Sequence, residues 1–239
     1  MKATLLITGD SKDFGHGHQV RMHNLALELK RRQLTTLHSV AQPGEVLRLP
    51  LEVGVVVLDR RDTDFNTIAG QTTAVSVAID NRGAARAQAD IVIDALPHMS
   101  MTAGEYEKAL RHVILPRQLT AMPSEVAKAR ITLCRTKAEA EANADFKASS
   151  GVLSPADYLT QMQLSSRPAL YFGQALFEAL YAGKHVQLYP ISDYHMQLAE
   201  DLVRRLNENN ALLQALDGLG LTRVADLLQG VHRKNQGKP

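Results

Sequence analysis

The segment ATLLITGDSKDFGHGHQVRMHNLALELKRR, residues 3–32, contains a short apolar run, a glycine-containing loop and an amphipathic helical pattern. The run Ala3–Thr8 is bounded by Gly9-Asp10, which is typical of a buried strand in a parallel sheet. After the loop, apolar residues recur at the spacing i, i+3, i+4, i+7 that places them on one helical face: Met22, Leu25, Ala26 and Leu29. The segment therefore predicts a strand, a loop and a helix, which is the first half of a βαβ unit.

The rest of the chain continues this alternation. Further strands rich in Val and Ile are predicted at 35–40, 53–58, 74–79 and 91–95, with room for crossover helices between them. A second series has strands at 131–134, 169–172 and 186–189, and helices at 137–147, 156–163, 174–182 and 194–209. Apolar spacing over 211–231 predicts packed terminal helices.

Prolines at 116 and 123 and the change of series place a domain boundary near Lys128. We expect an N-terminal α/β domain of residues 1–128, which carries the glycine–histidine loop. A shortened, nucleotide-binding-like α/β domain is expected to follow it over residues 129–239.

Composition excludes several classes of function. The 239 residues carry 27 Lys and Arg against 25 Asp and Glu, so a net charge of +2 gives no field that would gather a nucleic acid. One cysteine, Cys134, provides neither a disulfide framework nor a thiolate zinc site, and it fits a reducing compartment. The N-terminal apolar run is too short for a signal peptide or a membrane helix. We expect a soluble, cytoplasmic protein without a membrane span.

The glycine–histidine loop is the first candidate site. A strand, a glycine loop and a helix bring unpaired backbone N–H groups and the helix dipole to an anion such as a phosphate. The dinucleotide motif fails, because its third glycine would fall at Val20, and no P-loop motif occurs. His18 directly follows Gly17 at the mouth of the helix, where an imidazole can act as a general base. The alternative is a histidine that caps or packs without chemistry.

Residues 15–29, GHGHQVRMHNLALEL, resemble the pattern G-x-G-H-x-x-R-x-x-x-L-A-x-x-L of the UDP-sugar hydrolases of pseudaminic-acid biosynthesis. These enzymes are relatives of the spore-coat polysaccharide proteins and of the lipid-II-forming N-acetylglucosaminyltransferases. Residues 55–59 are similar to the family's strand that ends in Asp, and 77–81 to its next strand, which ends in paired acids. Residues 173–180 resemble its helix start with a ribose-binding glutamate. The resemblance implies an α/β fold of two Rossmann-like domains of GT-B type.

The resemblance also implies a reaction. The histidine matching His18 is the base that activates water for attack at the anomeric carbon, releasing UDP without a structural metal, and in the transferases a sugar acceptor replaces the water. The implied partner is a nucleotide sugar, most simply a UDP-sugar, in surface glycan or polysaccharide biosynthesis, and no cofactor is implied. The substrate-binding residues expected on this basis are Gly15, Gly17, Arg21, Asp80, Arg135, Gly173, Glu178 and His195.

The second domain departs from the family pattern. Residues 133–137, LCRTK, stand where the family has a Gly-Gly-Thr-Asp-like turn, so close approach of backbone to a diphosphate is either blocked or replaced by contacts from Arg135 and Lys137. His195 replaces a glutamine. A catalytically silent protein that binds a sugar nucleotide or a partner protein is therefore the competing hypothesis.

Other interpretations stay open at three places. His16, His18 and His23 suggest a metal site, which we disfavour because further ligands on a barrel would be needed. The sequence Asp59-Arg60-Arg61-Asp62 is interpreted as a solvated charge cluster, with Asp59 kept as an orienter of His18. Asp80 follows a strand, where ligands of α/β sheets bind, although a turn or N-cap role is equally consistent.

Overall fold

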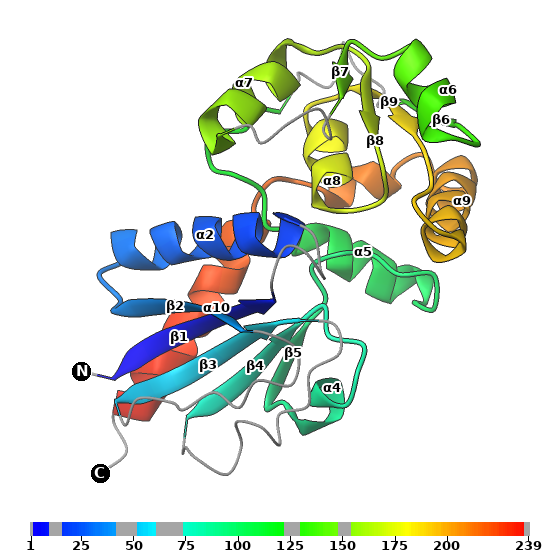
Figure 1. Ribbon diagram of the computed structural model, residues 1–239. Coiled ribbons are helices and arrows are strands. Elements are labelled where there is room, and N and C mark those ends of the chain that lie inside the picture. The colour runs from blue at the N-terminus through cyan, green and yellow to red at the C-terminus, as the bar shows by residue number, and fades with distance from the viewer. Residues whose placement is uncertain are drawn as a thin grey trace. The chain divides into compact units, whose positions relative to one another are not determined.

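The computed structural model of the chain describes residues 2–9, 16–41, 52–60, 74–121, 130–147 and 154–236 (Figure 1). The chain divides into two compact units. Unit 1 consists of Met1–Ala95 together with Leu219–Pro239, and unit 2 of Leu96–Gly218. Each unit is an α/β structure built on its own parallel sheet.

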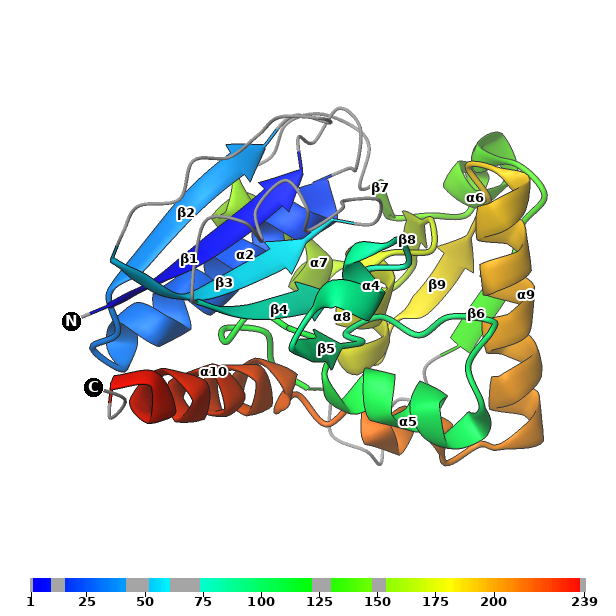
Figure 2. The ribbon, with the colours of Figure 1, turned by 90° about the horizontal axis from the view of Figure 1, so that it is seen from below.

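Unit 1 has a five-stranded sheet in the order β2-β1-β3-β4-β5, and Figure 2 shows the strands side by side in that order. Its strands are β1 (Ala3–Gly9), β2 (Thr36–Ala41), β3 (Val53–Asp59), β4 (Val75–Ile79) and β5 (Ile91–Ile93), all paired in parallel. Every residue of β1 and β3 is buried, which explains why their sequences are continuous apolar runs rather than alternating ones.

Three described helices belong to unit 1: α2 (His16–Arg31), α4 (Ala85–Gln88) and α10 (Gly220–Gln236). α2 packs against β1 and β2 through Met22, Leu25 and Leu29, which are fully buried as their spacing predicts. α10 returns from the far end of the chain to pack beside α2 and β3. Arg32, directly after α2, forms an ion pair with Asp226 of α10, and Val224 and Leu228 of α10 are completely buried, so the last helix is part of the first unit's core.

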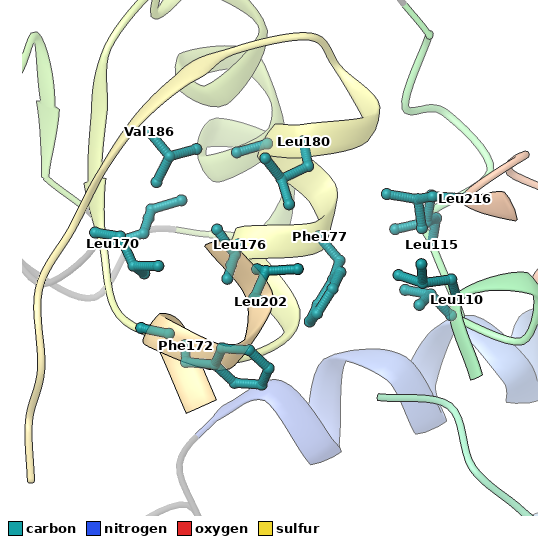
Figure 3. Close-up of a cluster of buried hydrophobic side chains, with 14 of the residues drawn as sticks. Leu110, Leu115, Leu170, Phe172, Leu176, Phe177, Leu180, Val186, Leu202 and Leu216 are labelled. Atoms are coloured by element: carbon teal, nitrogen blue, oxygen red, sulfur yellow. The ribbon is translucent and has the colours of Figure 1, made fainter. Parts of the chain in front are cut away.

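Unit 2 has a four-stranded parallel sheet in the order β6-β9-β8-β7. Its strands are β6 (Arg130–Leu133), β7 (Phe146–Lys147), β8 (Pro168–Leu170) and β9 (His185–Leu188). Its helices are α5 (Ala103–Arg111), α6 (Lys137–Ala142), α7 (Pro155–Leu164), α8 (Gln174–Tyr181), α9 (Asp193–Glu208) and the 3₁₀ turn η1 (Leu212–Ala215). Figure 3 shows side chains of β8, α8, β9 and α9 meeting in one apolar cluster, which includes Leu170, Leu176, Val186 and Leu202. None of the described helices of either unit is long and apolar enough to cross a membrane.

Most predicted elements are present, with three corrections. The helix predicted over 137–147 ends at Ala142, because Asn143 leaves the helical conformation, and Phe146–Lys147 form the short strand β7. The boundary predicted near Lys128 lies outside the described residues, and the compact units divide after Ala95 instead. The terminal helix assigned to the second domain belongs to unit 1, since its apolar face completes the core over α2 and β3.

The packing of α10 against α2 and β3 predicts how substitutions in and before this helix affect stability. Leu228 is completely buried, whereas Leu219, just before α10, is 52% exposed. We expect Leu228→Ala to lower the free energy of unfolding by about 2–5 kcal/mol, because it leaves a cavity, and Leu219→Ala to change it by less than about 1 kcal/mol. Amide hydrogen exchange should show the loss of protection in β1 and β3. Loss of protection in β8 and β9 alone would show that α10 does not stabilise unit 1.

Candidate functional site

His18 and Asp59 form a buried pair at the carboxyl end of the unit 1 sheet. His18 lies in the first turn of α2, and Asp59 is the last residue of β3. Nδ1 of His18 is 2.5 Å from Oδ1 of Asp59, and the two residues are 5% and 0% exposed. Asp59 is paired with Thr8 in the β1–β3 register. The His18–Asp59 pair therefore lies between the carboxyl end of β1 and the start of α2.

Arg21 lies one helical turn after His18 and binds two carboxylates. Its Nε donates to Oδ2 of Asp59 at 2.5 Å, and its two terminal nitrogens donate to Oδ1 of Asp59 and to Oδ2 of Asp80. The side chain is 1% exposed. The guanidinium therefore connects the ends of β3 and β4 to the start of α2.

The charges of this cluster hold one another in their ionised forms. Burial alone would raise the pKa of Asp59, but the charges and hydrogen bonds of Arg21 and His18 outweigh it and lower the pKa to about 2. Burial likewise opposes the charge on Arg21, yet Asp59 and Asp80 raise the pKa of this guanidinium above its ordinary value. Asp59 is thus a carboxylate, and Arg21 a cation, at any pH at which the protein works.

Asp80 has a backbone conformation that fixes its carboxylate. It follows β4 with φ of 48°, a left-handed conformation that Asp adopts more readily than most residues. Its backbone N–H donates to the carbonyl of Ile93 at 2.9 Å, and its Oδ1 accepts from the N–H of Ala95 at 2.7 Å. Oδ2 is left to face Arg21.

The geometry assigns the tautomer of His18. The Arg21 terminal nitrogen that bonds Oδ1 of Asp59 also lies 3.1 Å from Nδ1 of His18. Arg21 has only donors, and a lone pair on Nδ1 would be repelled by a carboxylate oxygen at 2.5 Å. Nδ1–H and the guanidinium therefore both donate to Oδ1 of Asp59. The neutral ring carries its basic lone pair on Nε2, as the hydrogen-bond pattern requires.

The cluster lies at the edge of the sheet where α/β proteins commonly bind ligands. In doubly wound α/β sheets, ligands bind outside the carboxyl ends of the strands at the point where the strand order reverses. With the order β2-β1-β3-β4-β5 that point lies between β1 and β3. His18, after β1, and Asp59, at the end of β3, flank it.

The structure brings together three residues that the sequence predicted separately: His18, Arg21 and Asp80. Arg21 and Asp80 were predicted to contact substrate, but their polar atoms are engaged with each other and with Asp59. Asp59 itself was missed as a site residue. The prediction of a solvated cluster is wrong for Asp59, which is fully buried, and the minor interpretation as an orienter of His18 describes its geometry. The signal in the sequence was its position directly after the predicted strand 53–58, where the carboxyl end of a parallel strand places side chains at the ligand-binding edge of the sheet.

Two glycines of the loop, Gly15 and Gly17, were predicted to bind substrate. Gly15 lies outside the described residues. Gly17 lies in the first turn of α2, half-buried and directly before His18.

In unit 2 the expected ribose ligand is an interior residue. Glu178 lies in the middle of α8 and is 1% exposed, and its Oε1 accepts from Nε2 of Gln174 at 3.2 Å. Burial raises the pKa of this carboxyl to about 7, despite its hydrogen-bonding partners. Gly173 precedes α8 in an extended conformation, with the ring of Tyr171 at van der Waals distance from where a Cβ would stand. A ribose has no access to a carboxyl buried in this way.

The turn expected to hold a diphosphate holds a carboxylate instead. The backbone N–H of Arg135 donates to Oε2 of Glu139 at 2.7 Å, and the N–H of Glu139 donates to the Thr136 hydroxyl at 3.2 Å. Lys137 is 3.7 Å from Glu141. The first turn of α6 is therefore satisfied internally, with a negative charge where a phosphate would need positive potential.

His195 lies in the first turn of α9 and packs among aromatic rings. Its Nδ1 is 2.8 Å from the Ser192 hydroxyl oxygen, and its ring centre lies 6.2 Å from that of Tyr171 and 5.5 Å from that of Tyr194. The structure thus groups His195 with Gly173 through Tyr171, at the carboxyl end of β8, and apart from Glu178 in the interior.

Within the described ranges, no three or more His, Cys, Asp or Glu side chains are arranged to bind a metal ion. Comparison of the chain with protein-family models, with curated proteins and with solved structures finds no match.

The burial of Glu178 predicts a pH dependence of stability. The folded pKa of about 7 lies above the ordinary value of 4.5, so the stability that the protonated form contributes is complete below about pH 4.5. It is lost as the pH rises through about 7, with a total of about 3 kcal/mol. Glu178→Gln should remove this dependence. Its advantage over the native chain in urea denaturation should be about 3 kcal/mol larger at pH 8 than at pH 4.5.

Glu200→Gln, a change at an exposed position of α9, is the matched control and should show no such dependence. An equal effect of Glu178→Gln at both pH values would mean that the pKa of this carboxyl is the same in the folded and the unfolded chain, and would contradict the prediction.

Proposed function

We propose that this protein transfers the glycosyl group of a nucleotide-activated sugar, most simply a UDP-sugar, to water or to an acceptor hydroxyl, with His18 as the general base. The observation that carries the proposal is the buried His18–Asp59 pair at the carboxyl end of the unit 1 sheet, with Nδ1 and Oδ1 2.5 Å apart. This is how a histidine base is oriented in hydrolytic enzymes, where a carboxylate holds the tautomer that leaves Nε2 basic.

The reaction step follows from that tautomer. Nε2 of His18 takes a proton from the attacking water or hydroxyl as the oxygen forms a bond to the anomeric carbon. The bond from that carbon to the UDP oxygen breaks, and UDP leaves with the electron pair. The imidazolium formed is stabilised by Asp59, which stays ionised because its pKa is about 2.

The substrate class rests on the resemblance of residues 15–29 to the UDP-sugar hydrolases. The same resemblance supports assigning the two units to a GT-B type of architecture. The parallel sheets of both units are compatible with Rossmann-like domains, which is the coarser part of that assignment. Cys134 is a free thiol, which fits a cytoplasmic location. We place the reaction there, in the synthesis of a surface glycan or polysaccharide.

A specific observation favours a second candidate, a protein that binds a sugar nucleotide or a partner without turning it over. Unit 2 buries Glu178, and at its surface the N–H of Arg135 is bonded by Glu139, so two of the expected nucleotide contacts already have partners within the chain. Without these contacts a nucleotide diphosphate is not held in a reactive position, which favours binding of a sugar nucleotide or of a partner protein without turnover.

The test removes the basic nitrogen of His18 while keeping the hydrogen bond that its ring makes within the fold. His18→Asn keeps an N–H donor near the position of Nδ1, facing Asp59, and removes Nε2. We expect kcat for UDP release from UDP-sugars to fall about 10²–10⁴-fold, with KM nearly unchanged, because the group acts in the transition state. His23→Asn, an exposed change on the same helix, is the matched control and should leave kcat unchanged.

A thermal-shift series with UDP, UDP-N-acetylglucosamine and the corresponding CMP, GDP and dTDP compounds separates the candidates. A ligand at 100 times its Kd should stabilise the chain by about 2.7 kcal/mol. A shift with UDP compounds but no turnover in water or with acceptors supports the second candidate. Turnover that survives His18→Asn refutes His18 as the base.

A further inference from the structure

Asp80 and Arg21 are placed to act on His18 rather than on a ligand. Asp80 is 6% exposed, and its two carboxylate oxygens accept from the N–H of Ala95 and from Arg21. Arg21 directs all three guanidinium nitrogens at carboxylates. A substrate that approached the sheet would meet neither side chain in a form able to bind it.

Arg21 alone would work against a base at His18. A terminal nitrogen of the guanidinium lies 3.1 Å from Nδ1 of His18, and its positive charge opposes the positive charge that the ring gains when Nε2 takes a proton. Asp59 carries one negative charge, which it shares between Arg21 and the protonated ring of His18. Asp80 supplies the second negative charge, so the protonated ring and the guanidinium together face an equal number of carboxylates.

Asp80 also fixes the direction of Arg21. A guanidinium is planar, so holding its Nε edge on Asp59 and its other terminal nitrogen on Asp80 defines its plane. The position of Asp80 is itself set by its left-handed backbone and by the bond from Ala95, 2.7 Å long, at the end of β5. The chain of contacts runs from the ends of β4 and β5 through Arg21 and Asp59 to the ring of His18.

Arg60, buried directly after Asp59 at the end of β3, is a further cation near this cluster, whereas two titratable groups on other elements packed against α2 have other partners. On β2, His38 lies 3.4 Å from the hydroxyl of Thr8 on β1. On α10, Asp226 pairs with Arg32, beyond the end of α2 opposite to His18. The side chains of Arg21, Asp59 and Asp80 are charged groups that bond the His18 ring or one another.

We propose that Asp80 is a positioning residue for the base, whose carboxylate holds Arg21 on Asp59 and supplies the negative charge that lets His18 accept a proton. The proposal rests on the proposed function in taking His18 as the base. It reassigns Asp80 from the substrate contact expected from the sequence to a group that acts through two others.

The test uses Asp80→Asn, because Asn also adopts the left-handed conformation and still accepts from Ala95 while losing the charge. Nitrogen-15 NMR of histidine-labelled protein, with the His18 signals identified by their loss in His18→Asn, reports ring protonation without any substrate. In the native chain the signals should show a proton on Nδ1 and none on Nε2 at high pH. In Asp80→Asn the midpoint of their pH-dependent change should move to lower pH, because the cluster of two cations has lost one of its two carboxylates.

Asp94→Asn is the matched control, because Asp94 directly follows β5 and forms its ion pairs with Arg82 and Arg86 rather than with Arg21. It should leave the His18 signals unchanged. An equal shift in both variants would show that any lost negative charge has this effect and would overturn the proposal. No shift in Asp80→Asn would overturn it as well. If Asp80→Asn does not fold, an Nε2–H tautomer in the native chain still refutes it.

Kinetics add a second measurement and keep the two proposals distinguishable. If the chain turns over UDP-sugars, Asp80→Asn should move the acid limb of the kcat/KM profile to lower pH and leave KM unchanged at the plateau. A rise in KM alone would restore Asp80 as a substrate contact. An inactive native chain with the NMR shift intact would refute the proposed function and leave the positioning role standing.

Discussion

The carboxylate of Asp59 is the interaction on which the arrangement of unit 1 depends. It ends β3, is completely buried, and accepts hydrogen bonds from His18 and Arg21 of one helix. A buried carboxylate without these partners would cost several kcal/mol, so the start of α2 is held at the end of β3. Apolar side chains could fill the same volume at no loss of stability. What they could not supply is a histidine with a defined tautomer at the reversal point of the sheet.

Among the described residues, the buried carboxyl of unit 2 has no cation bonded to it, unlike Asp59 in unit 1. This carboxyl, that of Glu178, has an amide from Gln174 beside it, and burial keeps its pKa near 7. Asp59 is therefore a stable anion near neutral pH, whereas Glu178 exchanges its proton in that range. The difference arises from neighbours and not from depth, because both residues are almost inaccessible to water. The same residue type thus serves as a fixed charge in one unit and as a titrating group in the other.

The sequence was informative where one local property decides the outcome. Apolar runs such as Ala3–Thr8 and Val53–Leu58 predicted the buried parallel strands, and the spacing of Met22, Leu25 and Leu29 predicted the buried face of α2. His18 was found because it directly follows the glycine-containing loop. The same reasoning could not show that α10 completes unit 1, since that depends on packing between residues far apart in the chain.

Charged residues were the harder problem. Asp59 stands in a run of four charged residues, which favours a solvated interpretation, and only the pairing of β3 with β1 reveals that Arg21 reaches it. Glu178 and Arg135 were assigned by resemblance, which places residues along the chain but does not report whether a side chain faces inward. That Glu178 is buried, and that the N–H of Arg135 is bonded by Glu139, follows only from the three-dimensional structure.

The central claim, that the His18 site directs an oxygen nucleophile to the anomeric carbon, is tested most directly by turnover of a UDP-sugar in water enriched in oxygen-18. Mass spectrometry should find the label in the anomeric hydroxyl of the released sugar and none in UDP. Label in the terminal phosphate of UDP, or no product either in water or with acceptor sugars, would contradict the account.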